Sequence, residues 1–170
     1  DAPGTVVAAP VAPASKAQVQ ASPSGINCAD EQATIFSCTL TDGSQLRVCQ
    51  VNGSAQYRFG PASGPAEMTL PQSAGGEWQW VSVPYSGGGE AQARFANGPF
   101  DYIVYSRMVR TRFDSQGNEP EFTDGVMVRQ NGATIANRRC DPATVSSLDV
   151  NALQSLRAPA DDLFAYVDEE

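Results

Sequence analysis

Residues 125–135 read GVMVRQNGATI, two β-type runs on either side of the pair Asn131-Gly132. An Asn-Gly pair supplies the two positive φ values of a type I′ turn, whose twist matches that of paired strands. A two-residue loop here pairs Val128 with Ile135 on one face of the sheet. The stretch therefore predicts an antiparallel β-hairpin and sets the expectation for the residues before it.

Short β-type runs separated by Gly, Pro, Asn and Asp continue upstream through residues 26–141. The other expected strands are residues 34–40, 45–51, 56–59, 67–70, 78–83, 92–96 and 102–113. Asp42-Gly43, between the first two, is a strong hairpin signal. At least eight short strands with frequent turns predict an all-β fold, an antiparallel sandwich or barrel, for a single domain over residues 26–170.

One short helix is expected near the C-terminus. Ser146 with Asp149 resembles a capping box, and an apolar stripe follows it and ends before Pro159. The stripe consists of Val150, Leu153 and Leu156. Residues 161–170 are acidic around Phe164 and Tyr166, and they either pack as a final strand or remain loose.

Residues 1–25 are rich in Ala, Pro, Val and Ser, with almost no charge and no apolar period. Such a segment buries too little surface to offset its ordering entropy, so we expect an extended linker. In envelope proteins linkers of this kind often tether a domain to an N-terminal lipid anchor, and an ordinary disordered terminus is the alternative.

Four cysteines, Cys28, Cys38, Cys49 and Cys140, predict two disulfides and an oxidising compartment such as the bacterial periplasm. If the connection around Asp42-Gly43 has an odd number of residues, Cys38 and Cys49 point to opposite sheet faces. A loop of two or four residues would remove that distinction. With an odd connection a Cys38–Cys49 bond is disfavoured, and we favour Cys28–Cys38 and Cys49–Cys140.

The composition favours binding over catalysis. The chain has no histidine, the commonest general base near neutral pH and the commonest metal ligand, so we expect neither an enzyme nor a cofactor. Its net charge of -8 would repel nucleic acid and anionic lipid, and would speed encounter with a basic partner. An acidic surface that merely maintains solubility is the alternative.

The segment 84–90, PYSGGGE, is the most unusual local feature. Three glycines in a row weaken a strand and permit close backbone approach, which predicts a protruding loop that enters a cleft of a partner. A mobile connection or a bulge is the alternative. The candidate partner-binding residues are Tyr85, Ser86, Gly87, Gly88, Gly89 and Glu90, with Tyr102 as a reachable aromatic on a later strand.

Trp78 and Trp80 share one face of a strand. On an exposed face the two indoles would form a glycan- or protein-binding platform, and on a buried face they would fill the core. We favour the core, because few other large side chains are available to fill a sandwich.

The turn-rich segment 114–124 carries many oxygen ligands of the kind that Ca²⁺ takes. The candidates are Asp114, Asn118, Glu119, Glu121 and Asp124. Their spacing lacks the EF-hand pattern, so a solvated acidic loop is the default interpretation. Carboxylates could also serve a glycan hydrolase, although no spacing in the sequence reveals a facing pair.

Several short runs between Cys28 and Cys140 together resemble a group of small exported bacterial β-proteins. These runs are Cys28-(x9)-Cys38, Tyr57-Arg58-Phe59-Gly60, the glycine segment, Arg94-Phe95-Ala96-Asn97-Gly98 and Tyr102-Ile103-Val104-Tyr105. Within that group the chain is similar to periplasmic inhibitors of invertebrate-type lysozyme and to related lipoprotein immunity proteins against lysozyme-like toxins.

The resemblance implies a β-sandwich or barrel with a Ser-Gly-x-x-Tyr loop that inserts into the lysozyme cleft and hydrogen-bonds its catalytic carboxylates. Ser86-Gly87 matches the start of that motif, and Glu90 stands in the place of the tyrosine. A glutamate there would be repelled by two carboxylates, so the role passes to Tyr85 or to the amides of Gly87 and Gly88.

Two functional hypotheses follow from these features. The first is a periplasmic, lipid-tethered inhibitor or immunity protein that blocks the cleft of a lysozyme-like muramidase with the glycine loop. The second is an envelope glycan- or ligand-binding module without catalytic activity, for which exposed indoles would be the sign.

Overall fold

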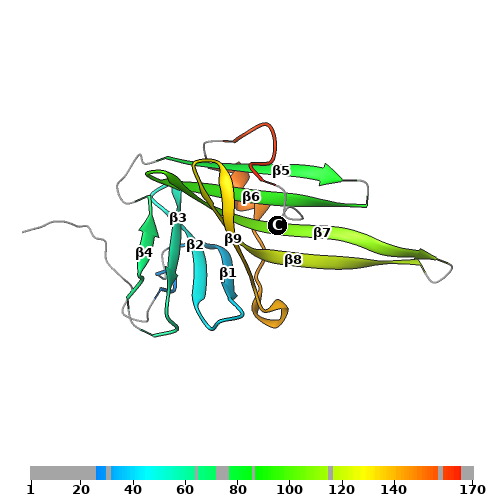
Figure 1. Ribbon diagram of the computed structural model, residues 1–170, viewed down its shortest axis with the longest axis horizontal. Coiled ribbons are helices and arrows are strands. Elements are labelled where there is room, and N and C mark those ends of the chain that lie inside the picture. Colours follow the sequence, from blue (N-terminus) through cyan, green and yellow to red (C-terminus); the bar gives the residue numbers. More distant parts are fainter. Residues whose placement is uncertain are drawn as a thin grey trace, which may run out of the picture.

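The computed structural model describes residues 26–29, 32–63, 65–71, 77–85, 87–114, 117–156 and 159–165, with the backbone alone for residues 85, 111–114 and 117–119. This part of the chain is mostly β-structure in two antiparallel sheets whose strands cross steeply (Figure 1). The predicted all-β sandwich is confirmed. The predicted tether, residues 1–25, lies outside the described residues.

Each sheet joins its strands in chain order, as expected for successive hairpins. The four-stranded sheet contains β1 (Thr34–Thr39), β2 (Gln45–Val51), β3 (Ser54–Gly60) and β4 (Met68–Leu70). The five-stranded sheet contains β5 (Trp78–Tyr85), β6 (Gly88–Asn97), β7 (Phe100–Asp114), β8 (Gly117–Gln130) and β9 (Ala133–Arg139). A 3-10 turn, η2 (Pro142–Thr144), and the helix α1 (Val150–Gln154) follow.

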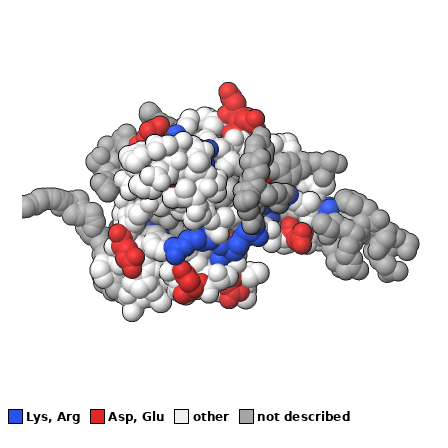
Figure 2. Space-filling view, viewed as in Figure 1, with Lys and Arg blue, Asp and Glu red and all other residues white. Residues whose placement is uncertain are grey.

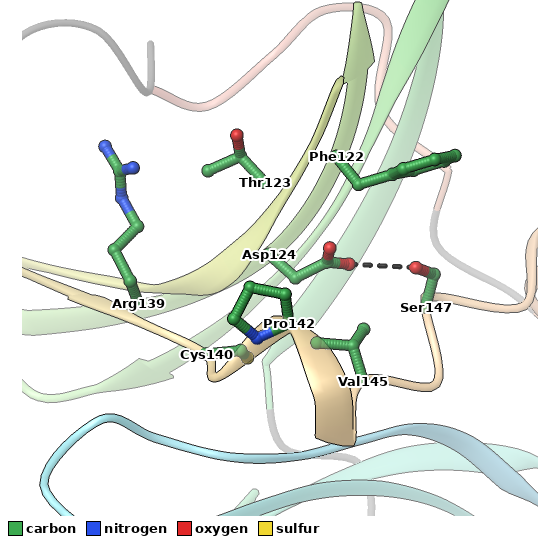
Figure 3. Close-up of a pocket in the computed structure, with 8 residues that line it drawn as sticks. All are labelled: Phe122, Thr123, Asp124, Arg139, Cys140, Pro142, Val145 and Ser147. Carbon is green, nitrogen blue, oxygen red and sulfur yellow. Dashed lines mark hydrogen bonds between the residues drawn. The ribbon is translucent and has the colours of Figure 1, made fainter. Parts of the chain in front are cut away.

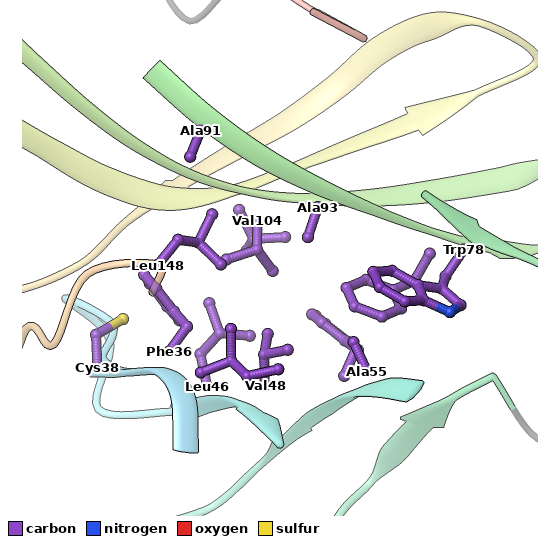
Figure 4. Packing of buried hydrophobic residues seen from close by; sticks show 14 of the residues in the cluster. Phe36, Cys38, Leu46, Val48, Ala55, Trp78, Ala91, Ala93, Val104 and Leu148 are labelled. Carbon is purple, nitrogen blue, oxygen red and sulfur yellow. The ribbon is translucent and has the colours of Figure 1, made fainter. Parts of the chain in front are cut away.

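The core lies between the two sheets, where every second residue of the facing strands is apolar (Figure 4). We call the face of the five-stranded sheet that points to this core its inner face. Trp78 is 8% exposed and stacks on Phe95 with 6.1 Å between ring centroids, and Tyr57 lies 5.7 Å from the same ring. The prediction that Trp78 belongs to the core is confirmed, and Trp80 packs against it half-buried.

Both predicted hairpin turns are confirmed. Thr39 pairs with Gln45, so the connection at residues 40–44 has an odd number of residues, and Gly43 has a φ of 93°. Asn131 and Gly132 have φ values of 51° and 86°, as a type I′ turn requires.

The predicted pairing of Val128 with Ile135 is wrong. Val128 pairs with Ala136 and Arg129 with Thr134, because a β-bulge inserts Ile135 between these two pairs. Ile135 is 55% exposed.

The expected disulfide pairing is also wrong: the bonds are Cys28–Cys49 and Cys38–Cys140. Cys38 and Cys49 do point to opposite faces of the four-stranded sheet, as predicted. Cys49 faces away from the core, where residues 26–29 cover it. Cys38 faces the core, where the chain returns beside β1 through a bridge between Leu40 and Cys140. Two disulfides are typical of an oxidising, extracytoplasmic environment.

The short C-terminal helix is confirmed, although its predicted cap is wrong. Asp149 is the N-cap, and its carboxylate accepts a hydrogen bond from the Ala152 amide at 3.1 Å. Ser146 instead forms a backbone bridge with Ser37 at the edge of β1. Among the described residues, no helix has the length and apolar character needed to cross a membrane.

Residues 159–165 cross the outer face of the five-stranded sheet (Figure 1). The Ala160 amide donates to the Trp80 carbonyl at 2.7 Å, at the edge of β5. Gln92 is fully buried beneath this segment: its amide donates to the Ala165 carbonyl at 2.8 Å and its Oε1 accepts from the Phe164 amide at 2.9 Å. The Gln92 side chain therefore holds this segment on the outer face through two hydrogen bonds.

Candidate functional site

The predicted protruding loop over residues 84–90 is not what the structure contains. Tyr85 pairs with Gly88, so β5 and β6 are joined by a tight turn in which Gly87 has a φ of 80°. Gly88, Gly89 and Glu90 are the first residues of β6. Ser86 lies outside the described residues, as does the side chain of Tyr85.

The glycines of this segment serve close packing within the sheet. A Cβ on Gly88 would collide with the backbone carbonyl of Met108 in β7, and one on Gly89 would come within 3.2 Å of the Val83 carbonyl oxygen. Glycine at position 88 thus permits β6 to lie against β7.

The Glu90 side chain does not project from a loop. It is 4% exposed and lies on the outer face, where its Oε2 accepts a 2.6 Å hydrogen bond from the Gln92 amide. Because side chains alternate along β6, Glu90 and Gln92 lie on the same face, the one that residues 159–165 cross. The predicted placement of Glu90 in a protruding loop is therefore wrong.

Tyr102 does not join this region. It lies on the inner face, half-buried against the core, with its ring 5.6 Å from that of Tyr57. It pairs with Phe95, whereas Gly89 pairs with Met108, six residues further along β7 and so roughly 20 Å away. The structure separates the predicted tyrosine from the predicted loop.

The five candidate calcium ligands do not form a loop, because Gly117–Gln130 is the strand β8. Glu121 and Asp124 are three positions apart in it, so they point to opposite faces of the sheet and cannot share one ion. The side chains of Asp114, Asn118 and Glu119 lie outside the described residues. Among the residues that the structure describes, no cluster of three potential metal ligands occurs.

A different surface stands out. The last residues of β5 and β7 and the first residues of β6 and β8 extend past the four-stranded sheet (Figure 1). In the described part of the chain, no second sheet covers their inner face. We call this part the overhang; its described side chains belong to residues 82–84, 88–91, 106–110 and 120–124. Phe122 on its inner face is 60% exposed, the most exposed large apolar side chain described.

Phe122 separates two hollows. On one side, a groove of about 410 Å³ lies between the overhang and the segment that leads into α1. Its apolar side chains include Pro84, Met108, Leu148 and Val150. On the other side, a pocket of about 460 Å³ lies between β8 and residues 139–147 (Figure 3). Phe122 and Ser147 line both hollows, so the two lie next to each other.

Asp124 is the acidic group of the pocket. The residue is 6% exposed, and its Oδ2 accepts a 2.9 Å hydrogen bond from the Ser147 hydroxyl (Figure 3). Burial raises the pKa of the Asp124 carboxyl above its usual range, against the opposing effect of hydrogen bonds from Ser106 and Ser147. Ser106 is itself held in place, since its hydroxyl oxygen accepts from the Leu148 amide at 2.9 Å.

The raised pKa makes a testable prediction about stability. A carboxyl whose pKa is higher in the folded than in the unfolded state stabilises the fold at low pH, and that stabilisation is lost as the pH rises through the folded-state pKa. Asp124→Asn removes this ionisation. We expect the melting temperature of the variant, relative to wild type, to increase from acidic to neutral pH. Thermal melts between pH 3 and 8 would measure it, and a difference independent of pH would contradict the assignment.

Charge is distributed unevenly around the molecule. Figure 2 shows acidic side chains spread around the rim of one face and basic side chains across its middle, where β9 crosses the four-stranded sheet. The net charge of -8 is therefore not gathered into one acidic patch on this face. The net charge would therefore act on a basic partner at long range, through the summed field of the whole protein.

Sequence reasoning missed Phe122 and Ser147. Extending the alternation of the hairpin upstream from Val128 and Val126 would have placed Asp124 and Phe122 on the inner face. The dense acidic and turn-forming residues of 114–121 obscured that signal. Ser147 carried no signal of its own, because its position depends on how the chain returns after Cys140.

Comparison with known proteins does not help to interpret this surface. The chain matches no family model, and neither a curated protein nor a solved structure is significantly similar to it. The overhang is therefore interpreted from its own residues.

Proposed function

We propose that the protein is a non-catalytic inhibitor or immunity protein that binds a lysozyme-like muramidase and blocks its active-site cleft. The observation that carries the proposal is the overhang: a projecting, concave sheet end with an exposed Phe122 between two hollows. Exposed aromatic side chains beside pockets are typical anchors of protein–protein interfaces.

The muramidase as partner rests on the sequence resemblance. The net charge of -8 supports it, because an acidic protein associates faster with a basic one. The two disulfides support an exported protein. In this proposal the protein acts in the bacterial periplasm, and residues 1–25 tether the domain through an N-terminal lipid anchor.

The structure changes how such an inhibitor would bind. Because Gly88, Gly89 and Glu90 belong to β6, a long glycine loop is not available as the inserting element. In this proposal the overhang, through its described residues, takes that role. Trp78 lies in the core, so the glycan-binding alternative loses the exposed indole pair that would favour it.

The test is inhibition of peptidoglycan hydrolysis by a panel of lysozymes of different classes. Phe122→Ala should weaken inhibition of the susceptible enzyme by about 2 kcal/mol, roughly 30-fold, because the side chain would be a central anchor of the interface. Its exposure means that the melting temperature should change little.

Ile135→Ala is the matched control. Ile135 is 55% exposed and apolar like Phe122, but it lies in the bulge of the β8–β9 hairpin, away from the overhang. We expect this variant to inhibit as well as wild type. Equal losses in both variants would contradict the overhang as the binding surface. Binding to purified peptidoglycan, without inhibition of any lysozyme, would replace the proposed function by a glycan-binding one.

A further inference from the structure

The pocket beside Phe122 combines an aromatic wall with a nearly buried carboxylate. Figure 3 shows the Phe122 ring over the hydrogen bond between Asp124 and Ser147, with Pro142 and Val145 on the opposite wall. Its volume of about 460 Å³ falls in the range of pockets that bind small organic groups. The pocket can therefore admit one large side chain or a small ligand.

The Asp124 carboxylate has acceptor capacity that its neighbours do not use. A carboxylate offers about four acceptor positions, and the hydroxyls of Ser147 and Ser106 supply two donors. Among the described residues, no further side-chain donor to Asp124 is recorded, which leaves two positions for the donors of an incoming group. Because the carboxylate is shielded from water, a charged donor would gain more there than at an exposed acid.

Arg139 is the basic residue among the described residues that line the pocket, and its side chain does not point to Asp124. The Arg139 side chain extends away from Asp124 (Figure 3), and it makes a side-chain hydrogen bond with Tyr105. The Arg139 side chain therefore does not fill the space between Asp124 and the Phe122 ring.

We propose that this pocket binds a cationic side chain, the guanidinium of an arginine or the ammonium of a lysine, supplied by the protein partner. The cation would bond to Asp124 and lie against the Phe122 ring, the arrangement of a cation–π contact. Asp124 is the sole carboxylate among the described residues that line the pocket, which favours an organic cation over a metal ion. That the cation belongs to a protein partner rests on the proposed function.

The test measures the cation alone, on the full chain. Backbone amide NMR spectra would be recorded while N-acetyl-arginine methylamide is added, and separately N-acetyl-lysine methylamide. We expect saturable shifts at residues 122–124 and 147 with at least one of the two probes. N-acetyl-citrulline methylamide, which is nearly isosteric with arginine but uncharged, should bind at least tenfold more weakly.

Three variants sharpen the result. Asp124→Asn should weaken probe binding at least tenfold, and Phe122→Ala should weaken it severalfold. Asp141→Asn removes the same charge from an exposed residue that does not line the pocket, and it should bind like wild type.

Equal binding of citrulline and arginine, unchanged binding by Asp124→Asn, or no shift at the pocket residues would each overturn the proposal. The spectra also show directly whether each variant is folded. Probe binding without inhibition of any lysozyme would leave the cation pocket standing and remove the proposed function. Inhibition without probe binding would do the reverse.

Discussion

Replacing Cys38 and Cys140 together by alanine should lower the free energy of unfolding by about 4–5 kcal/mol. The bond closes a loop with a sequence separation of 102 residues and joins β1 of one sheet to the chain that leaves β9 of the other. Without it, the unfolded chain gains conformational freedom and the junction beside the pocket loses its covalent tie. Urea unfolding followed by tryptophan fluorescence would measure the loss.

The other disulfide supplies the matched control. Cys28–Cys49 spans 21 residues, so its removal should cost about 3 kcal/mol in the same loop-closure relation. Peptide mapping of the oxidised protein should find these two pairs and no others. An equal or smaller loss for the Cys38–Cys140 variant would contradict the view that this bond contributes more.

The second large effect is expected at Gly125, in the middle of β8. A Cβ there would collide with the backbone carbonyl of Arg138 in β9 and approach the Tyr105 hydroxyl to 2.9 Å. That hydroxyl is fully buried with its ring and donates a 2.7 Å hydrogen bond to Asn137, and burial raises the pKa of Tyr105 to about 12. Neither a backbone carbonyl nor a buried, hydrogen-bonded ring can move aside at low cost.

Gly125→Ala should therefore destabilise the protein by about 3 kcal/mol, at the upper end of what overpacking a core costs. Gly89→Ala is the control, because its nearest obstacle, the Val83 carbonyl oxygen, lies at 3.2 Å and the expected loss is about 1 kcal/mol or less. Chemical denaturation of both variants would test the difference. Wild-type stability of Gly125→Ala would show that β8 and β9 can separate locally without penalty.

Strand positions followed from local patterns, and strand lengths did not. Residues 45–51 were predicted as a strand and form β2 with the same bounds. In contrast, β6 and β8 begin earlier than expected, at Gly88 and Gly117. Glycine and clustered acids disfavour strands in isolation, but both segments obtain their hydrogen bonds from β7, which lies between them. Sheet neighbours therefore overrode local preference at these two starts.

The disulfides likewise combine a local feature, which the sequence predicted, with a long-range feature, which it did not. Alternation correctly placed Cys38 and Cys49 on opposite faces, since a residue's face depends on its immediate neighbours in the chain. The bonding partner of each cysteine depended on where two segments distant in the chain pack against the four-stranded sheet. Residues 26–29 cover the outer side of the four-stranded sheet, and the chain after β9 returns to the edge of β1.

For the candidate site, the sequence by itself determined the residue types: a chain without histidine, an acidic net charge, and an apolar Phe122 among acids. It also determined the fold class, because period-two alternation and turn chemistry act over a few residues. Only the tertiary structure decided that Glu90 is buried, that Phe122 is exposed, and that Asp124 meets Ser147 across 23 positions of chain. Those outcomes depend on how far one sheet extends past the other and on where the C-terminal segments pack, and no local interaction encodes either.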